Sequence, residues 1–155
     1  MNNAHAQQRL FQQKLEAAMA SLPANHIWLI ATRENLEQPE PGLNLLMDAH
    51  FTWDAFFVVS QDSATAIVGR FDAASVPDGW GIVSYDEDYT AALHTEISRW
   101  QPEVILLNYA PDNALCDGLT HGMFLNLRRA LPDAPFQSAS EFLSRLRSVK
   151  TPLEL

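Results

Sequence analysis

The chain has 155 residues, of which 47% are hydrophobic and 19% are charged, and this composition is typical of one globular domain with a buried core. The formal net charge of −9 argues against nucleic acids and anionic membranes as partners, because both bind basic faces. No apolar run approaches the ~20 residues of a membrane span, and the N-terminus lacks the apolar core of a signal peptide. The single Cys116 cannot form an internal disulfide, so we expect a cytoplasmic protein.

The charge is spread unevenly along the chain. From Glu34 to Asp117 the sequence carries 15 acidic and 2 basic residues, whereas the segments before and after this stretch are slightly basic. The simplest interpretation is a solvated surface that keeps the protein in solution. The alternative is an acidic rim that attracts a cationic substrate.

The first 47 residues predict a helix, a strand and a long loop. Apolar residues at helical spacing predict an amphipathic helix over residues 7–22, which Pro23 ends. The continuous apolar run 27–31 is typical of a strand that is covered on both faces. Residues 32–42 are polar and contain two prolines, so they form a loop and are the first place to look for function. Residues 43–47 fit either a strand or one helical turn.

A run of antiparallel-type strands is predicted next. Residues 55–60 and 64–71 are rich in β-forming side chains, and the turn residues 61–63 join them as a hairpin. Turn chemistry at 77–79 precedes another strand at 81–85.

The second half of the chain predicts helices around one more strand. Acidic residues at 86–88 suit the start of a helix that runs to Trp100. Residues 104–109 form a second fully apolar strand. Asp117 is expected to be the N-cap of a helix that ends near Leu131.

The last twenty residues predict one complete helix and the start of another. Ser138 and Glu141 fit a capping box ahead of a helix that reaches residue 150. Thr151 and Glu154 fit a second capping box just before the sequence stops. We therefore expect one domain over residues 1–150, with residues 151–155 starting a linker helix to a missing domain. The whole order predicts an α/β fold, with a mixed sheet flanked by helices on both sides.

The motifs of a self-contained enzyme are not found in this sequence. It has no glycine-rich phosphate loop and no Gly-x-Ser-x-Gly elbow. Cys116 and His121 lie five residues apart around a predicted helix start, so a cysteine hydrolase is conceivable, but a small buried or semi-buried cysteine explains Cys116 better. No two of the five histidines have the spacing that would let them ligate one metal from one helix. The histidines are His5, His26, His50, His94 and His121.

Three stretches, in this order, resemble the creatinase-type N-terminal domain of the pita-bread metallopeptidases. The first is Thr-Arg-Glu-Asn at 32–35 with Glu-Pro-Gly-Leu at 40–43, and the second is 108–110 with 117–123. The third is the linker-like ending at 146–155. The family includes aminopeptidase P, prolidase (Xaa-Pro dipeptidase) and creatinase, and the stretches are most similar to the Xaa-Pro aminopeptidase branch. The sequence departs from many prolidases in lacking a Tyr-Leu-Thr-Gly stretch after Asn35.

The resemblance implies a non-catalytic domain with a mixed sheet flanked by helices, related to the ribonuclease H-like architecture. It implies that two divalent metal ions (Mn, Co or Zn) are held by two Asp, one His and two Glu in a C-terminal catalytic domain that this chain lacks. This chain alone would then have no catalytic residue, metal ligand or cofactor. It would cover the active site of its own catalytic domain, limit the access of peptide substrates and support a homodimer.

Five positions are implied to take part in substrate access or in the interface: Arg33, Glu34, Asn35, Asp117 and His121. The alternative for all five is ordinary turn and cap chemistry. For the whole chain, the alternative is a stand-alone binding or interaction domain without peptidase activity. We also expect an exposed apolar patch where the missing part would dock, through which the chain would self-associate.

Overall fold

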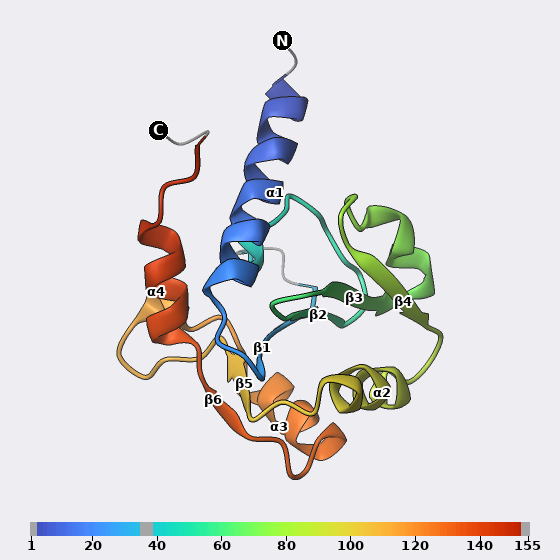
Figure 1. Cartoon of the computed structure of the whole chain (residues 1–155). Coiled ribbons are helices and arrows are strands. Elements are labelled where there is room, and N and C mark those ends of the chain that lie inside the picture. Colours follow the sequence, from blue (N-terminus) through green and yellow to red (C-terminus); the bar gives the residue numbers. More distant parts are fainter. Residues whose placement is uncertain (1–2, 35–38, 153–155) are drawn as a thin grey trace.

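One mixed sheet of six strands runs through the part of the chain that the computed structural model describes, residues 3–34 and 39–152 (Figure 1). The strands are β1 (His26–Thr32), β2 (Ala55–Val59), β3 (Ala64–Gly69), β4 (Gly81–Tyr85), β5 (Val104–Leu107) and β6 (Phe136–Ser138). Their order across the sheet is β4-β3-β2-β1-β5-β6. β2 is antiparallel to both of its neighbours, whereas the other three neighbouring pairs are parallel.

Helices cover both faces of this sheet. In the described ranges they are α1 (Asn3–Ser21), α2 (Thr90–Trp100), α3 (His121–Ala130) and α4 (Ser140–Ser148), with short 3-10 helices η1 (Leu43–Leu45), η2 (Arg70–Ser75) and η3 (Ala114–Cys116). α1 and α4 lie on one side, and α2 and α3 lie on the other (Figure 1). None of these helices is long and apolar enough to cross a membrane. The predicted mixed sheet with helices on both sides is confirmed.

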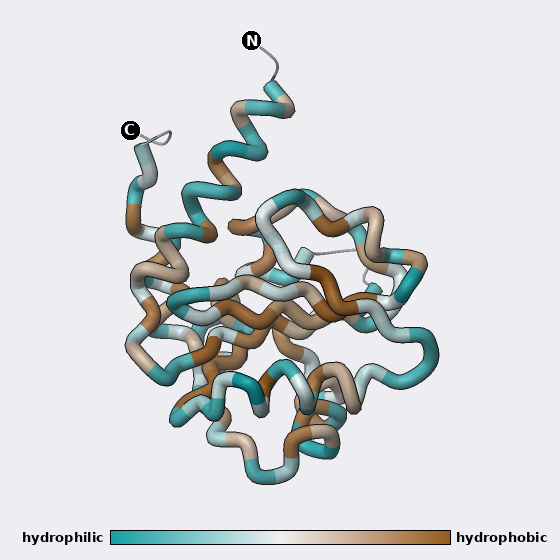
Figure 2. Tube along the Cα trace, turned by 45° about the vertical axis from the view of Figure 1, so that its right-hand side comes forward, coloured by the Kyte–Doolittle hydropathy of each residue, from teal (hydrophilic) through white to brown (hydrophobic). Residues whose placement is uncertain are grey.

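The central strand β1 is buried from both sides. Trp28 and Ile30 belong to the core under α1 and α4, and Leu29 belongs to the core under α2 and α3. Burying a side chain of this size stabilises the fold by roughly 1.5–3 kcal/mol. In Figure 2 the hydrophobic colour is concentrated along the strands, while much of α1 is hydrophilic. The prediction of a strand covered on both faces is confirmed.

The chain leaves β3 earlier than predicted. The strand expected over residues 64–71 ends at Gly69, because Arg70 starts η2. η2 and the turn after it return the chain to the other end of the sheet, so β4 pairs parallel with β3. The prediction of an antiparallel run is therefore correct for β2 and β3 and wrong for β4. The ambiguous segment 43–47 contains the single helical turn η1.

Only the serine half of the predicted C-terminal capping box is present, and Ser138 belongs to a strand that the sequence patterns did not show. The Ser138 hydroxyl donates to the carbonyl oxygen of Tyr109 and accepts from the Ser140 backbone N–H at 3.2 Å. Glu141 accepts instead from Arg145 at 2.6 Å, one helical turn along α4. Glu154, in the second predicted capping box, lies outside the described residues.

A buried lysine joins the first helix to the last. The Lys14 Nζ donates to the carbonyl oxygens of Leu146 at 3.2 Å and Val149 at 2.8 Å. These carbonyls lie at the C-terminal end of α4, which carries the negative end of the helix dipole, so the ammonium is favourably placed. Beyond this contact, the N-terminal half of α1 projects past the rest of the molecule (Figure 1).

Candidate functional site

A polar hollow of about 540 Å³ lies where the parallel neighbours β1 and β5 end. One wall is the segment that follows β1, and the other is the segment that joins β5 to α3. Polar groups that converge from two loops beside strand ends are typical of binding sites in α/β proteins. The lining residues are Ala31, Thr32, Arg33, Pro39, Glu40, Pro41, Ala114, Leu115, Asp117, Gly118, Leu119, Thr120, His121 and Met123.

Three of the five predicted site residues meet in this hollow. Arg33 lines one wall, and Asp117 and His121 line the other. Glu34 is not among the lining residues; its carboxylate lies 3.8 Å from the Nε2 of His50. Asn35 lies outside the described residues. The fold therefore brings together side chains that are 84 to 88 positions apart in the sequence, but it leaves their roles untested.

Arg33 spans the distance between the start of β2 and the start of α3. Its Nε lies 3.7 Å from the Asp54 carboxylate, and a Cβ placed on Gly122 would lie 3.7 Å from its Nη1. The guanidinium thus lies against Gly122 in the first turn of α3, and Gly122 directly follows His121 in the sequence. This ion pair is part-exposed, so it stabilises the fold little and leaves the guanidinium free to meet a ligand.

Asp117 is not the helix cap that the sequence predicted. α3 starts at His121, and its N-cap is Thr120, whose hydroxyl accepts from the Met123 backbone N–H at 3.2 Å. Asp117 lies before that turn, and its Oδ1 accepts from the Ala110 backbone N–H at 3.2 Å. The carboxylate thus braces the loop after β5 while it lines the hollow.

A chain of buried hydrogen bonds lies beneath the hollow. The Trp28 Nε1–H donates to the Asn108 Oδ1 at 2.7 Å, and the Asn108 Nδ2–H donates to the Glu40 Oε1 at 2.9 Å. The other carboxylate oxygen, Oε2, accepts from the Leu43 backbone N–H at 2.6 Å. The Asn108 carbonyl oxygen accepts from the N–H groups of the two residues after Asp117, at 3.0 and 2.9 Å.

Sequence reasoning missed this network as a unit. Glu40 and Asn108 were considered as members of resembling stretches and not as partners. A signal was present, because Asn108 directly follows a fully apolar strand and polar side chains at that position line the ends of parallel strands. The partnership of two residues 68 positions apart is set by the fold.

Two glycines let the network pack closely. A Cβ on Gly42 would lie 2.4 Å from the Asn108 Nδ2, and a Cβ on Gly118 would lie 2.4 Å from the Glu40 Oε1. Both distances are far below van der Waals contact, so any larger residue would displace the amide or the carboxylate. The network therefore requires glycine in both walls of the hollow.

The structure gives no support to a Cys116–His121 dyad. Cys116 is fully buried, as the simpler interpretation predicted, and its Sγ lies 3.5 Å from the Ser144 Oγ and 3.6 Å from the Ser140 carbonyl oxygen in α4. His121 is exposed and lines the hollow, which Cys116 does not. The described part of the chain also contains no group of three His, Cys, Asp or Glu side chains that could hold a metal ion.

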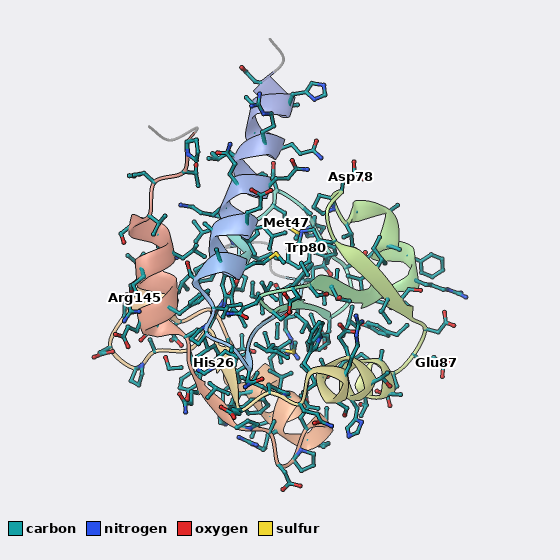
Figure 3. The ribbon with its side chains drawn as sticks, in the orientation of Figure 1. His26, Met47, Asp78, Trp80, Glu87 and Arg145 are labelled. Carbon is teal, nitrogen blue, oxygen red and sulfur yellow. The ribbon has the colours of Figure 1, made fainter. Side chains whose placement is uncertain are left out.

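A second hollow, of about 390 Å³, separates α1 from the segments around Met47 and Trp80. Figure 3 shows Met47 and Trp80 between α1 and β4, with Asp78 at the outer end. This hollow has few charged side chains, and it contains none of the predicted site residues. The hollow beside β1 and β5 is therefore the better candidate site.

Comparisons with known proteins find likeness in structure and not in sequence. No protein-family model and no curated protein matches the chain. An X-Pro aminopeptidase from Thermotoga maritima matches with a TM-score of 0.61 and 15% identity, over 81% of this chain and 34% of that one. The aminopeptidase P, Xaa-Pro aminopeptidase, from Streptococcus thermophilus matches with a TM-score of 0.62 and 11% identity, over 91% and 98%.

A third structure is a single domain. The creatinase/prolidase N-terminal domain of an X-Pro dipeptidase from Streptococcus pyogenes matches with a TM-score of 0.51 and 14% identity, over 93% of this chain and 99% of that one. The chain spans about a third of the length of the Thermotoga maritima enzyme and of a Pyrococcus horikoshii prolidase. At these identities the likeness shows the fold: this chain has the fold of the creatinase/prolidase N-terminal domain.

Proposed function

We propose that this chain is the non-catalytic N-terminal domain of a longer Xaa-Pro aminopeptidase or dipeptidase. The observation that carries the proposal is the fold likeness, over most of this chain, to domains and enzymes with those names. In this proposal residues 1–150 form the domain and residues 151–155 begin the connection to a catalytic part. That part would hold two divalent metal ions, which activate a water and polarise the scissile carbonyl.

The hollow beside β1 and β5 would be the part of this domain that meets the substrate. It combines the cationic Arg33 with the anionic Asp117, so it can hold both a charged end and the polar backbone of a short peptide. Glu40 is unsuited to bind a substrate amino group, because both of its oxygens already accept hydrogen bonds inside the protein. Asp117 is therefore the better acid for that role. The domain would limit substrate length and support a homodimer.

A cleavage assay tests the proposal. The chain is expressed alone and joined to the polypeptide that its gene encodes beyond Leu155, and both proteins are given short Xaa-Pro peptides with manganese. We expect cleavage by the longer protein alone. In that protein, Asp117→Asn is expected to raise KM with a smaller effect on kcat, because Asp117 would contact the peptide away from the metal ions.

Two results would contradict the proposal. Cleavage by the short chain would mean that it contains a catalytic site, and a gene that ends at Leu155 would favour a stand-alone binding domain. Asp62→Asn, in the exposed β2–β3 turn at the opposite end of the sheet, is the matched control and is expected to leave KM unchanged. If Asp117→Asn behaves like this control, the role of Asp117 is limited to bracing its loop.

A further inference from the structure

Glu40 is a buried carboxylate that ties the two walls of the hollow together. It belongs to the wall that follows β1, and its side chain is only 8% exposed. Through Asn108 it contacts the other wall, since the Asn108 backbone oxygen accepts from the N–H groups of Gly118 and Leu119. Every link in this connection is a short hydrogen bond inside the protein, so the position of one wall depends on the other.

The direction of each hydrogen bond in this network is fixed. The Trp28 indole N–H can only donate, so the Asn108 side-chain oxygen must face Trp28, and its NH₂ must face Glu40. The Leu43 backbone N–H can also only donate, and it faces the second oxygen of Glu40. Both oxygens of Glu40 therefore accept, and an ionised carboxylate accepts these bonds more strongly than a protonated carboxyl group, one of whose oxygens becomes a hydroxyl donor.

We propose that Glu40 and Asn108 form a proton-operated latch, which holds the two walls of the hollow together while Glu40 is ionised and releases them when Glu40 binds a proton. A proton on either oxygen would add a donor beside that of Asn108 or that of Leu43 and would weaken the hydrogen bond that this oxygen accepts. The latch depends only on contacts within this chain, so it stands whether or not the hollow meets a peptide substrate.

Because the side chains of the network are closely packed, the weakened hydrogen bond to Glu40 leads to a movement of the walls. The amide of Asn108 cannot rotate to offer its oxygen to Glu40 without losing the bond from Trp28. Gly42 and Gly118 already lie as near to these side chains as a Cβ-free residue allows, so the carboxyl group has little room to turn. The remaining way to separate the two donors is to move the segment that carries Glu40.

The surroundings favour protonation under milder acid than an exposed glutamate requires. Burial raises the pKa of Glu40, and the hydrogen bonds from Leu43, Asn108 and Gly42 and the nearby Arg147 oppose this only in part. Arg147, on α4, also donates to the Pro41 carbonyl oxygen at 3.5 Å. β1 contributes only the neutral Trp28 to the network.

The other charged groups along the described walls have partners of their own or lie in the open hollow. Arg33 pairs with Asp54, and Asp117 accepts from a backbone N–H. His121 is exposed on the first turn of α3. A change of charge on any of these side chains leaves the donor and acceptor roles inside the latch unchanged, so the latch predicts that Glu40 is the group whose titration moves the walls.

The test is a pH titration of the ¹⁵N,¹³C-labelled full chain followed by NMR. The side-chain carboxyl carbon of Glu40 reports its ionisation, and the Trp28 indole N–H and the Leu43 and Gly118 amides report the latch. We expect all four signals to move with one midpoint, above the ordinary range for a glutamate. The Trp80 indole, which belongs to the other hollow, is the internal control and is expected to stay in place.

Variants separate the latch from general effects of acid. Glu40→Gln carries a permanent donor, so its Trp28 and Gly118 signals at neutral pH should match those of the acidified natural chain and should not titrate. Arg147→Gln removes a cation that favours ionised Glu40, so the midpoint should shift to higher pH. The proposal is overturned if the Glu40 carboxyl carbon titrates while the Trp28 and Gly118 signals of the natural chain stay in place. This last measurement needs no variant to fold.

Discussion

Glu40 and Asp72 are both buried carboxylates that hold a loop, but the protein surrounds them in different ways. Asp72, 5% exposed, accepts from the backbone N–H groups of Thr52 and Trp53 and from the Thr52 hydroxyl, at 2.9–3.2 Å. These partners are 19 and 20 positions away in the sequence. Glu40 accepts from backbone N–H groups close in the sequence, at Leu43 and Gly42, and from one side chain, 68 positions away. Asp72 therefore closes a local loop, whereas Glu40 joins two distant ones.

The two carboxylates also support different surfaces. Glu40 lies beneath the polar hollow, and Asp72 holds the base of an aromatic cluster of Trp53, Phe71 and Tyr85. Trp53 lies flat on Gly69, where a Cβ would be 2.3 Å from its ring. Phe71 is 71% exposed, and the expected apolar patch for docking stays a prediction. The comparison teaches that an acid-rich segment contains internal ties as well as a solvated surface.

Removal of the Asn108 side chain is expected to have the largest effect on stability, because two hydrogen bonds of the buried network are lost. Asn108→Leu leaves the Trp28 indole N–H without its acceptor and removes the side-chain donor to a buried carboxylate. Each loss costs about 1–3 kcal/mol, so we expect the free energy of unfolding to fall by roughly 3 kcal/mol or more. Urea denaturation measures this change.

The matched control for this variant is Asn44→Leu, the same replacement at an exposed position nearby. It is expected to change the free energy of unfolding by no more than about 0.5 kcal/mol. Similar values for the two variants would mean that the buried network contributes nothing beyond an ordinary surface amide. That result would also remove the basis for a latch.

The local tie at Asp72 is expected to contribute less. Asp72→Asn places an NH₂ group against backbone donors, yet one oxygen can still accept from Thr52 or Trp53, so we expect a loss of about 1–3 kcal/mol in urea denaturation. The Trp53 indole signal should also broaden, because the loop that carries it loses its anchor. Asp78→Asn, at an exposed carboxylate, is the control and should have no measurable effect. An unchanged Trp53 signal in Asp72→Asn would show that the aromatic contacts alone hold the cluster.

Sequence reasoning predicted the elements better than the links between them. Apolar runs and turn residues located β1, β2 and β5, because a strand buried on both faces needs continuous apolar side chains. β6 was missed because its three residues carry no period, and it forms through its pairing with β5. Asp117 was misassigned because acids suit N-caps in general, whereas here Thr120 is closer to the first turn of α3. Residue type indicates which interactions a side chain can form, but its partner is set by the fold.

The same limit applies to the hollow. Its residues Arg33, Asp117 and His121 were singled out from the resemblance, while Glu40 and Asn108 were not, although they connect the walls. No local pattern links the two, since their contact depends on the pairing of β1 with β5. The acids of residues 34–117 look alike in a charge count, and burial separates them into internal and exposed groups.

The smallest expected effect is a dependence on pH that separates Glu40 from exposed acids. Because burial raises the pKa of Glu40 in the folded state, the folded chain takes up this proton at a higher pH than the unfolded chain. Its contribution to stability is therefore complete below the ordinary glutamate pKa and is lost as the pH rises through the folded value. Protonation opens the latch but still stabilises the folded state, because a neutral carboxyl group costs less free energy to bury than a carboxylate.

Glu40→Gln does not titrate, so the natural chain should gain stability relative to this variant as the pH falls through that window. Urea denaturation of both proteins at pH 7 and at mildly acidic pH measures the difference, and the background titration of all other groups cancels because both chains share it. Glu141→Gln, at an exposed acid of α4, is the matched control for the replacement itself. A constant difference for Glu40→Gln would mean that its hydrogen bonds fully offset burial, so that Glu40 stays ionised and the latch stays closed.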